Sequence, residues 1–232
     1  MYIRFGKKSA PPISGEQILS KDSPEKVKEA YRNLRSAITL ALGEEEGKVI
    51  AVTSVNRFEG KTLSAINLAV AFAQIGKKVL VVDGNLRDPR VHTALGENRS
   101  PGLTDLVENG AALSSVILYN KERDIEVLPA GSECDDPTRI FQSGACSGLL
   151  HSLKDHYDYI LIDYPADCVA SDSLLRVKET DGYLLVVKAG ETERRSVVKL
   201  IKNIENVRGN IIGFVYNMGV PEESRNPYDI LY

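Results

Sequence analysis

Three apolar segments of this sequence lead directly into residues that can bind a phosphate or a cation. The segment KVIAVT runs into the loop at residues 54–62, SVNRFEGKT, while the segment KVLVV ends at Asp83 and the segment YILI ends at Asp163. Ligands of an open parallel sheet bind outside the carboxyl ends of its strands. If the three segments are strands of one such sheet, the loop and the two carboxylates meet in one crevice. This arrangement predicts a magnesium–nucleotide site.

The end of the loop carries the phosphate-binding part of this prediction. Gly60, Lys61 and Thr62 lie at the start of an apolar helix predicted over residues 61–75, so that backbone N–H groups and the helix dipole would attract phosphate. Lys61 would add a positive charge for the outer phosphates, and the Thr62 hydroxyl would bind magnesium. The strict pattern G-x-x-x-x-G-K-[ST] is not met, because no glycine stands at its first position. An ordinary strand–helix turn that contains a lysine is the alternative.

The two acids are candidate metal-binding residues together with Thr62. Asp163 stands at the end of its segment, the position of an acid that holds magnesium through water opposite a phosphate loop. The alternative is an aspartate that caps the next segment. Asp83 could orient a hydroxyl group or accept its proton, which makes it a candidate general base. Arg87 is a further catalytic candidate, although Arg87 and Arg90 could instead form structural ion pairs or face a neighbouring subunit.

The composition is that of an ordinary globular protein. The 232 residues carry a formal net charge of −3, with 43% hydrophobic and 26% charged residues, which suits one large α/β domain and does not indicate nucleic acid as a partner. No apolar stretch reaches the roughly 20 residues of a membrane span, and residues 1–20 lack the apolar core of a signal peptide. The cysteines Cys134, Cys146 and Cys168 have no metal-ligand spacing, which favours reduced thiols in a cytoplasmic protein.

Continuous runs of valine, isoleucine and leucine alternate with helical patterns along the chain. Such runs are typical of strands covered on both faces, and a repeated strand–helix order predicts right-handed crossovers and a parallel sheet. The predicted fold is therefore α/β, a mostly parallel sheet with helices on both faces. The strands are expected at residues 48–53, 78–83, 124–129, 158–163, 182–188 and 210–217. The helices are expected from an N-cap at Ser23, followed by Pro24, to a stop at Gly43, and at residues 61–75, 103–118, 143–155, 172–178 and 194–207.

The two ends of the chain are predicted to lie outside the folded domain. Residues 1–22 contain a Pro-Pro pair and several basic residues, and they are expected to form a flexible tail. Residues 221–232 follow the last predicted strand with no helix after them. The tyrosines of this segment, Tyr228 and Tyr232, are either accessible to a kinase site or belong to an ordinary frayed terminus.

Charged residues follow the apolar stripe of the first predicted helix at a spacing of three. Glu29, Arg32 and Arg35 lie to the side of that stripe, and they are therefore expected to be accessible. A solvated charged face is the default interpretation of such a pattern. A contact between subunits is the alternative.

Taken in order, these motifs resemble those of the bacterial tyrosine kinases, or BY-kinases, which are P-loop proteins related to the MinD and ParA ATPases. The charged residues of the first helix match the family's E-x-x-R-x-x-R oligomerisation motif, and EGKT at residues 59–62 matches its Walker A loop. VVDGNLRDPRVH at residues 81–92 is similar to its Walker A′ motif, and ILIDYP at residues 160–165 is similar to its Walker B motif. The likeness extends from about Glu29 to Tyr232.

The resemblance implies a P-loop NTPase fold and an ATP- and Mg²⁺-dependent tyrosine autokinase that phosphorylates its own C-terminal tyrosines across the subunits of a ring. It implies the separate cytoplasmic form, which regulates capsular or exopolysaccharide biosynthesis and reaches the inner face of the membrane only through a membrane-anchored adaptor. Residues 23–220 would form the kinase domain and residues 221–232 the tyrosine-bearing tail. The implied residues are Lys61, Asp83, Asp163 and Arg87 for catalysis; Phe58, Glu59, Gly60, Lys61, Thr62, Leu63 and Asn217 for the nucleotide; Thr62, Asp83 and Asp163 for the metal; Tyr228 and Tyr232 as acceptors; and Glu29, Arg32 and Arg35 for oligomer contacts.

Two other functions remain open from the sequence. Asn85 stands where the Walker A′ motif usually has a second aspartate, and Phe58 stands where a glycine is usual just before Glu59. These differences favour a nucleotide-binding scaffold with weak or no kinase activity in the same pathway. The third possibility is an ATPase of the MinD or ParA type, but those proteins have an extra lysine where Asn56 stands here, and the sequence has no membrane-targeting helix or basic DNA-binding face.

Overall fold

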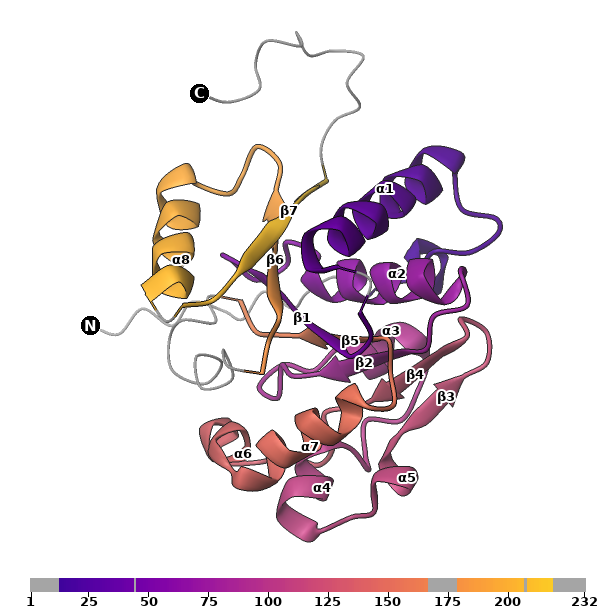
Figure 1. Cartoon of the computed structure of the whole chain (residues 1–232), viewed down its shortest axis with the longest axis vertical. Helices are drawn as coiled ribbons and strands as arrows, with labels where there is room; N and C mark the ends of the chain where they lie inside the picture. Colours follow the sequence, from indigo (N-terminus) through magenta and orange to yellow (C-terminus); the bar gives the residue numbers. More distant parts are fainter. Residues whose placement is uncertain (1–12, 44, 167–178, 207, 219–232) are drawn as a thin grey trace, which may run out of the picture.

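A mostly parallel sheet of seven strands forms the centre of the structure (Figure 1). The computed structural model describes residues 13–43, 45–166, 179–206 and 208–218. The strand order is β3-β4-β2-β5-β1-β6-β7, and neighbouring strands are parallel except for the antiparallel pair β3 and β4. The predicted parallel α/β sheet is thereby confirmed. The strands are β1 (Lys48–Ser54), β2 (Val79–Asp83), β3 (Leu118–Asn120), β4 (Ile125–Leu128), β5 (Tyr159–Asp163), β6 (Gly182–Lys188) and β7 (Ile211–Asn217).

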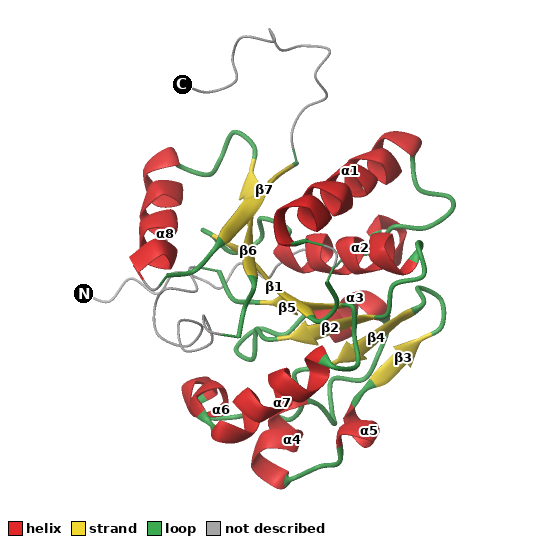
Figure 2. Ribbon diagram, in the orientation of Figure 1, coloured by secondary structure: helices red, strands yellow, loops and turns green. Residues whose placement is uncertain are grey.

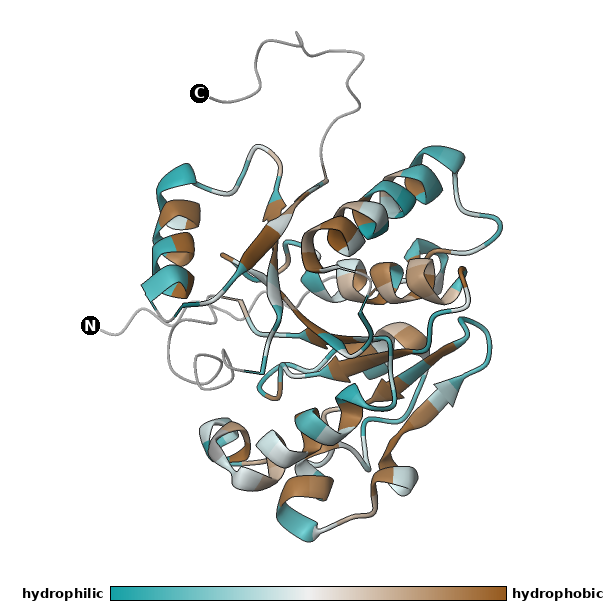
Figure 3. Cartoon of the chain, in the orientation of Figure 1, coloured by the Kyte–Doolittle hydropathy of each residue, from teal (hydrophilic) through white to brown (hydrophobic). Residues whose placement is uncertain are grey.

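Helices cover both faces of the sheet, as predicted (Figure 2). One core is shared by the sheet and by α1 (Glu25–Leu42), α2 (Lys61–Ala73) and α3 (Val91–Leu95). The core on the other face includes side chains from α4 (Leu103–Asn109), α5 (Leu113–Val116), α6 (Pro137–Gln142), α7 (Gly144–Lys154) and α8 (Arg194–Asn206). Figure 3 shows apolar residues along the central strands, whereas α1 and α8 carry both apolar and polar stripes. No helix in the described part of the chain combines the length and apolar character that a membrane span requires.

The region predicted as helical at residues 103–118 differs in the structure. Gly110 has a left-handed backbone (φ 64°) and ends α4, and the short α5 follows. Residues 118–120 then form an antiparallel edge strand that pairs with β4. The helical pattern of the sequence did not indicate this strand. The short helices α3 and α6 were also not predicted. The helix expected at residues 172–178 lies outside the described residues.

The N-terminal segment packs against the domain from Ile13 onward. A short 3-10 turn, Gly15–Gln17, leads to Ile18 and Leu19, which are buried in the core beside α2. The Leu19 N–H donates to Asn67 Oδ1 at 2.7 Å, which fastens the segment to α2. The prediction of a flexible tail over residues 1–22 is therefore wrong where Ile18 and Leu19 are buried in the core. Residues 1–12 lie outside the described part.

The first helix begins one residue later than predicted, and one of its arginines is not fully accessible. Pro24 rather than Ser23 is the N-cap residue, with no side-chain cap. Glu29 and Arg32 are exposed, as expected from the sequence. Arg35, however, is half-buried and donates from Nη1 to the backbone oxygen of Ala71 at 2.6 Å, because α1 packs on α2.

Candidate nucleotide-binding site

The structure brings together the three strand ends on which the sequence prediction rests. Strand β5 lies between β1 and β2, so the loop after β1 and the acids that end β5 and β2 are neighbours. In the register of β2 and β5, Asp83 lies directly opposite Asp163. Both side chains are fully buried. Two carboxylates without contact to water therefore lie beside the start of α2.

The first turn of α2 supplies the groups that contact Asp163. The hydroxyl of Thr62 donates to Asp163 Oδ2 at 2.6 Å, and the ammonium of Lys61 lies 3.6 Å from Asp163 Oδ1. Asp163 Oδ1 accepts no hydrogen bond, although it is buried. Burial raises the pKa of Asp163, and the nearby charge of Lys61 and the hydrogen bond from Thr62 oppose that rise.

Asp83 is held by backbone groups of the segment that follows β2. Its Oδ2 accepts hydrogen bonds from the N–H groups of Arg90 and Val91, each at 3.0 Å, and its Oδ1 accepts one from Asn85 at 3.3 Å. Burial, together with the negative charge of Asp163, raises the pKa of Asp83 to about 7. Asp83 therefore titrates near neutral pH, which is the range in which a general base works best.

These groups fit a magnesium ion that is shared with phosphates. Two buried carboxylates face the single ammonium group of Lys61, and Asp163 Oδ1 has no hydrogen-bond donor. Among the described residues, no group of three or more histidine, cysteine, aspartate or glutamate side chains could hold a metal by itself. Mg²⁺ typically takes only one or two protein carboxylates and completes its coordination with phosphate and water. Thr62, Asp163 and Asp83 would hold the ion here.

The phosphate loop enters α2 through two left-handed residues. Gly60 is the N-cap of α2 with φ 91°, and Phe58 has φ 67°, a conformation that is unfavourable for a residue with a side chain. Asn217, at the end of β7, donates from Nδ2 to the backbone oxygen of Glu59 at 2.9 Å. A side chain at position 60 would collide with this amide group. The glycine is therefore required both by the backbone and by close packing.

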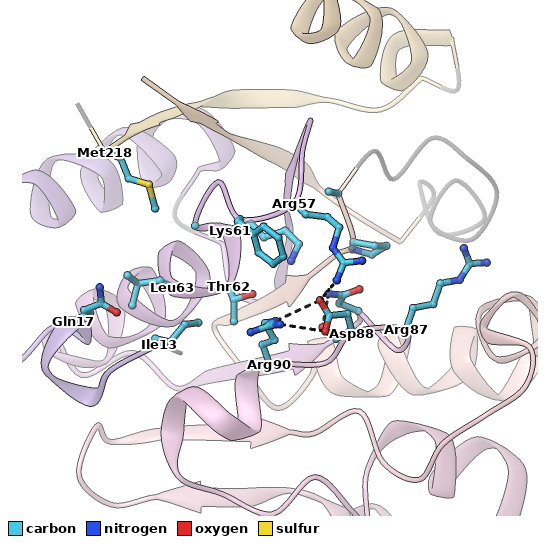
Figure 4. A pocket seen from close by; sticks show the side chains of 15 residues that line it. Ile13, Gln17, Arg57, Lys61, Thr62, Leu63, Arg87, Asp88, Arg90 and Met218 are labelled. Atoms are coloured by element: carbon cyan, nitrogen blue, oxygen red, sulfur yellow. Dashed lines mark hydrogen bonds and ion pairs between the residues drawn. The ribbon is translucent and has the colours of Figure 1, made fainter. Parts of the chain in front are cut away.

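A cavity of about 310 Å³ opens above this loop (Figure 4). This volume lies at the lower end of the range for small-molecule sites, roughly 300–1,000 Å³. Glu59 and Asn217, which were predicted to bind nucleotide, are not among the residues that line the cavity. The lining residues are Ile13, Gln17, Arg57, Phe58, Gly60, Lys61, Thr62, Leu63, Asn85, Arg87, Asp88, Arg90, Pro165, Ala166 and Met218.

A group of charged residues lies at the cavity, and it includes Arg90, for which the sequence left a structural ion pair open; the roles of Asp88 and Arg57 were not predicted. Asp88 pairs with Arg57 at 2.5 Å and with Arg90 at 3.4 Å. Both guanidinium groups also lie over the ring of Phe58, with distances to its centroid of 5.3 Å and 5.8 Å. Asn85 is buried and donates from Nδ2 to the backbone oxygen of Asp88 at 2.7 Å, so it shapes this turn. Arginine pairs of this kind have no local sequence pattern.

The remaining predicted site residues differ in their placement. Arg87 lines the cavity, but Figure 4 shows its side chain directed away from Lys61 and Thr62. Its catalytic role stays a prediction. The acceptor tyrosines Tyr228 and Tyr232 lie outside the described residues, and so does Cys168.

Comparison with known proteins identifies relatives over most of the chain. The family model for an AAA domain matches residues 47–213. The tyrosine-protein kinase CpsD of Streptococcus pneumoniae serotype 4 is 33% identical over 196 residues, which cover 83% of this chain and 84% of that protein. The tyrosine-protein kinase YwqD of Bacillus subtilis is 31% identical over 189 residues, covering 82% of this chain and 80% of that protein.

Solved structures with the same fold include kinases and an ATPase. The kinase domain of the Escherichia coli tyrosine kinase ETK has a TM-score of 0.80 and 27% identity, covering 88% of this chain and 80% of that one. The chimerical protein CapA2B2 has a TM-score of 0.79 and 29% identity, covering 89% of this chain and 93% of that one. The cell-division ATPase MinD of Pyrococcus furiosus has a TM-score of 0.62 and 28% identity, covering 73% and 71%. The predicted P-loop NTPase fold is confirmed.

Replacing Gly60 tests whether the geometry of the loop controls phosphate binding. In Gly60→Ala, the methyl group would displace Asn217 from Glu59, and the positive φ would be strained. We expect the Kd for Mg-ADP, measured by titration with a fluorescent analogue, to rise about tenfold or more. Gly76 has φ 80° but open space around it, so Gly76→Ala is a control for backbone strain alone. An equal Kd for both variants would contradict the role of the loop.

The raised pKa of Asp83 predicts a pH dependence of stability in metal-free protein. The unfolded chain loses this proton at about pH 3.9, whereas the folded protein keeps it up to about pH 7. The stabilising contribution is therefore present at low pH and is lost as pH rises through 7. Between pH 5 and 7, the free energy of unfolding of the wild type should fall relative to that of Asp83→Asn by up to about 1.4 kcal/mol per pH unit. Urea unfolding in EDTA measures this difference, and parallel pH profiles would contradict it.

Proposed function

The chain belongs to the family of bacterial tyrosine-protein kinases, and we propose that it is an ATP-dependent autokinase of its own C-terminal tyrosines. One observation carries the proposal. Lys61, Thr62 and Asp163 lie at the start of one helix and at the end of one strand beside the cavity, and Asp83 lies opposite Asp163. Phosphoryl transfer needs positioned phosphates, a place for the metal and a group that accepts the proton of the nucleophile.

Each of these residues has a separate role in the proposal. Lys61 binds the outer phosphates of ATP, and Thr62 and Asp163 hold Mg²⁺, which neutralises charge on the phosphates when it is bound. Asp83, which the backbone N–H groups of Arg90 and Val91 hold opposite Asp163, accepts the proton of the acceptor tyrosine. The buried position of both acids keeps water from competing for these charges.

The acceptors in this proposal are Tyr228 and Tyr232 of a neighbouring copy in a ring. Glu29 and Arg32 are exposed on α1, where a neighbouring subunit can reach them. Arg32 forms an ion pair with Glu25 of its own helix at 2.8 Å. To contact a neighbouring subunit in a ring, Arg32 would have to break this pair or bind both partners at once. Arg35 would contribute by fixing α1 on α2, through its bond to Ala71.

The proposed setting is capsular or exopolysaccharide biosynthesis at the inner face of the cell membrane. Kinases named CpsD and CapB are among the relatives, and the chimerical protein CapA2B2 is among the structural neighbours. Their likeness to this chain supports a cytoplasmic kinase that is activated and recruited by a separate membrane-anchored adaptor.

A nucleotide-binding scaffold in the same pathway is the second candidate function. The ring of Phe58 lines the cavity beside Lys61, and Asn85 adds no negative charge beside Asp83. Both features would weaken phosphoryl transfer more than nucleotide binding. A scaffold of this kind would bind ATP and oligomerise with negligible turnover.

Intact-mass spectrometry separates the two functions. The full chain, produced without other kinases, is incubated with Mg-ATP and a peptide of the adaptor's cytoplasmic tail. The autokinase should gain phosphate that localises to Tyr228 or Tyr232, and Lys61→Met should gain none because the phosphates lose their cation. If the wild type binds ATP but its mass does not change, the chain is a scaffold.

A further inference from the structure

The buried carboxylate of Glu59 fixes the path of the phosphate loop. Glu59 is 3% exposed. Its Oε2 accepts hydrogen bonds from the backbone N–H groups of Val55 at 3.0 Å and Asn56 at 3.1 Å, and its Oε1 accepts one from Asn56 Nδ2 at 2.9 Å. These bonds close the loop on itself between the end of β1 and the start of α2.

A threonine far away in the sequence completes this set of donors. Thr192 lies between β6 and α8, and its Oγ1 donates to Glu59 Oε1 at 2.5 Å. Thr192 Oγ1 also accepts a hydrogen bond from the backbone N–H of Lys188 at 2.8 Å. Because an N–H can only donate, the one hydroxyl proton of Thr192 points at Glu59. The last residue of β6 is thus connected to the phosphate loop through two hydrogen bonds in series.

The loop needs this outside support because its own conformation is unfavourable. Glu59 lies between Phe58 and Gly60, which have φ values of 67° and 91°. A left-handed conformation is unfavourable for a residue with a Cβ, such as Phe58, so contacts from outside the loop help to hold this backbone. Asn217 adds a second tie, from the end of β7 to the backbone oxygen of Glu59.

We propose that Thr192 is a positioning residue of the nucleotide site. It holds Glu59 and, through Glu59, the loop backbone in the conformation that accepts phosphates, while it is not itself among the lining residues of the cavity. The proposal rests on nucleotide binding at Lys61 and Thr62, as inferred above. It assigns a part in binding to the turn after β6, which carries no phosphate-binding motif.

Two substitutions at this position separate the hydroxyl from the rest of the side chain. Thr192→Val keeps the shape of the side chain but removes the hydroxyl that bonds to both Glu59 Oε1 and the Lys188 N–H. We therefore expect the Kd of the full chain for a fluorescent analogue of Mg-ADP to rise about tenfold. Thr192→Ser keeps the hydroxyl, and its Kd should stay within about twofold of the wild type, since the same hydrogen bonds can form.

Thr104 provides a matched control. It is a buried threonine of α4 whose hydroxyl donates to the backbone oxygen of Ser132 at 2.9 Å, and neither residue lines the cavity. Thr104→Val should lower the thermal midpoint without changing the Kd. If Thr192→Val behaves in the same way, its role is structural only and the proposal is wrong.

A double-mutant cycle tests whether Thr192 acts through Glu59. In a Glu59→Gln background, Thr192→Val should have a much smaller effect on the Kd, because the charged acceptor is already gone. Additive effects would overturn the relay through Glu59. A wild type that fails to bind Mg-ADP would overturn the proposed function and this inference with it, whereas normal binding by both wild type and Thr192→Val would overturn the inference alone.

Discussion

Two carboxylates buried side by side, with one lysine to balance them, form the constraint on which the rest of the site depends. The pairing of β2 with β5 puts Asp83 opposite Asp163, and Lys61 is the single ammonium group that lies within 4 Å of Asp163 among the described ion pairs. Uncompensated buried charge is costly, so the site either keeps a proton on Asp83 or takes up a cation. Asp163 Oδ1 is also left without a hydrogen-bond donor, which fits the proposed role of this oxygen in holding a metal.

Beside these charged groups, the phosphate loop has to hold its conformation before the nucleotide binds. Three groups hold the loop: the carboxylate of Glu59 within the loop, Thr192 from the turn after β6, and Asn217 from the end of β7. Strands β6 and β7 are the next two strands beyond β1, so the loop after β1 is held by its neighbours in the sheet. Preorganised backbone donors of this kind contribute to phosphate binding without a cost of rearrangement during the reaction.

The sequence predicted the sheet, its helices on both faces and the convergence of its strand ends, because continuous apolar runs that end in acids reflect both burial and topology. It did not predict features that depend on contacts between distant residues. Thr192 reaches Glu59 from another part of the chain, and Arg35 bonds to the backbone of α2, so neither shows in local spacing. The packing of Ile18 and Leu19 was missed because two apolar residues in a polar segment give no periodic signal. The break at Gly110 was missed because one glycine within a helical pattern is often tolerated.

The most direct test of the central claim is the effect of magnesium on ADP affinity, measured by calorimetry for the wild type and for Asp163→Asn. Removing one of two adjacent buried acids relieves repulsion, so this variant should remain folded. If Asp163 holds the metal, magnesium will strengthen ADP binding to the wild type by about tenfold or more, and most of this gain will be lost in Asp163→Asn. The same magnesium dependence in both proteins would contradict a metal–nucleotide site at these strand ends.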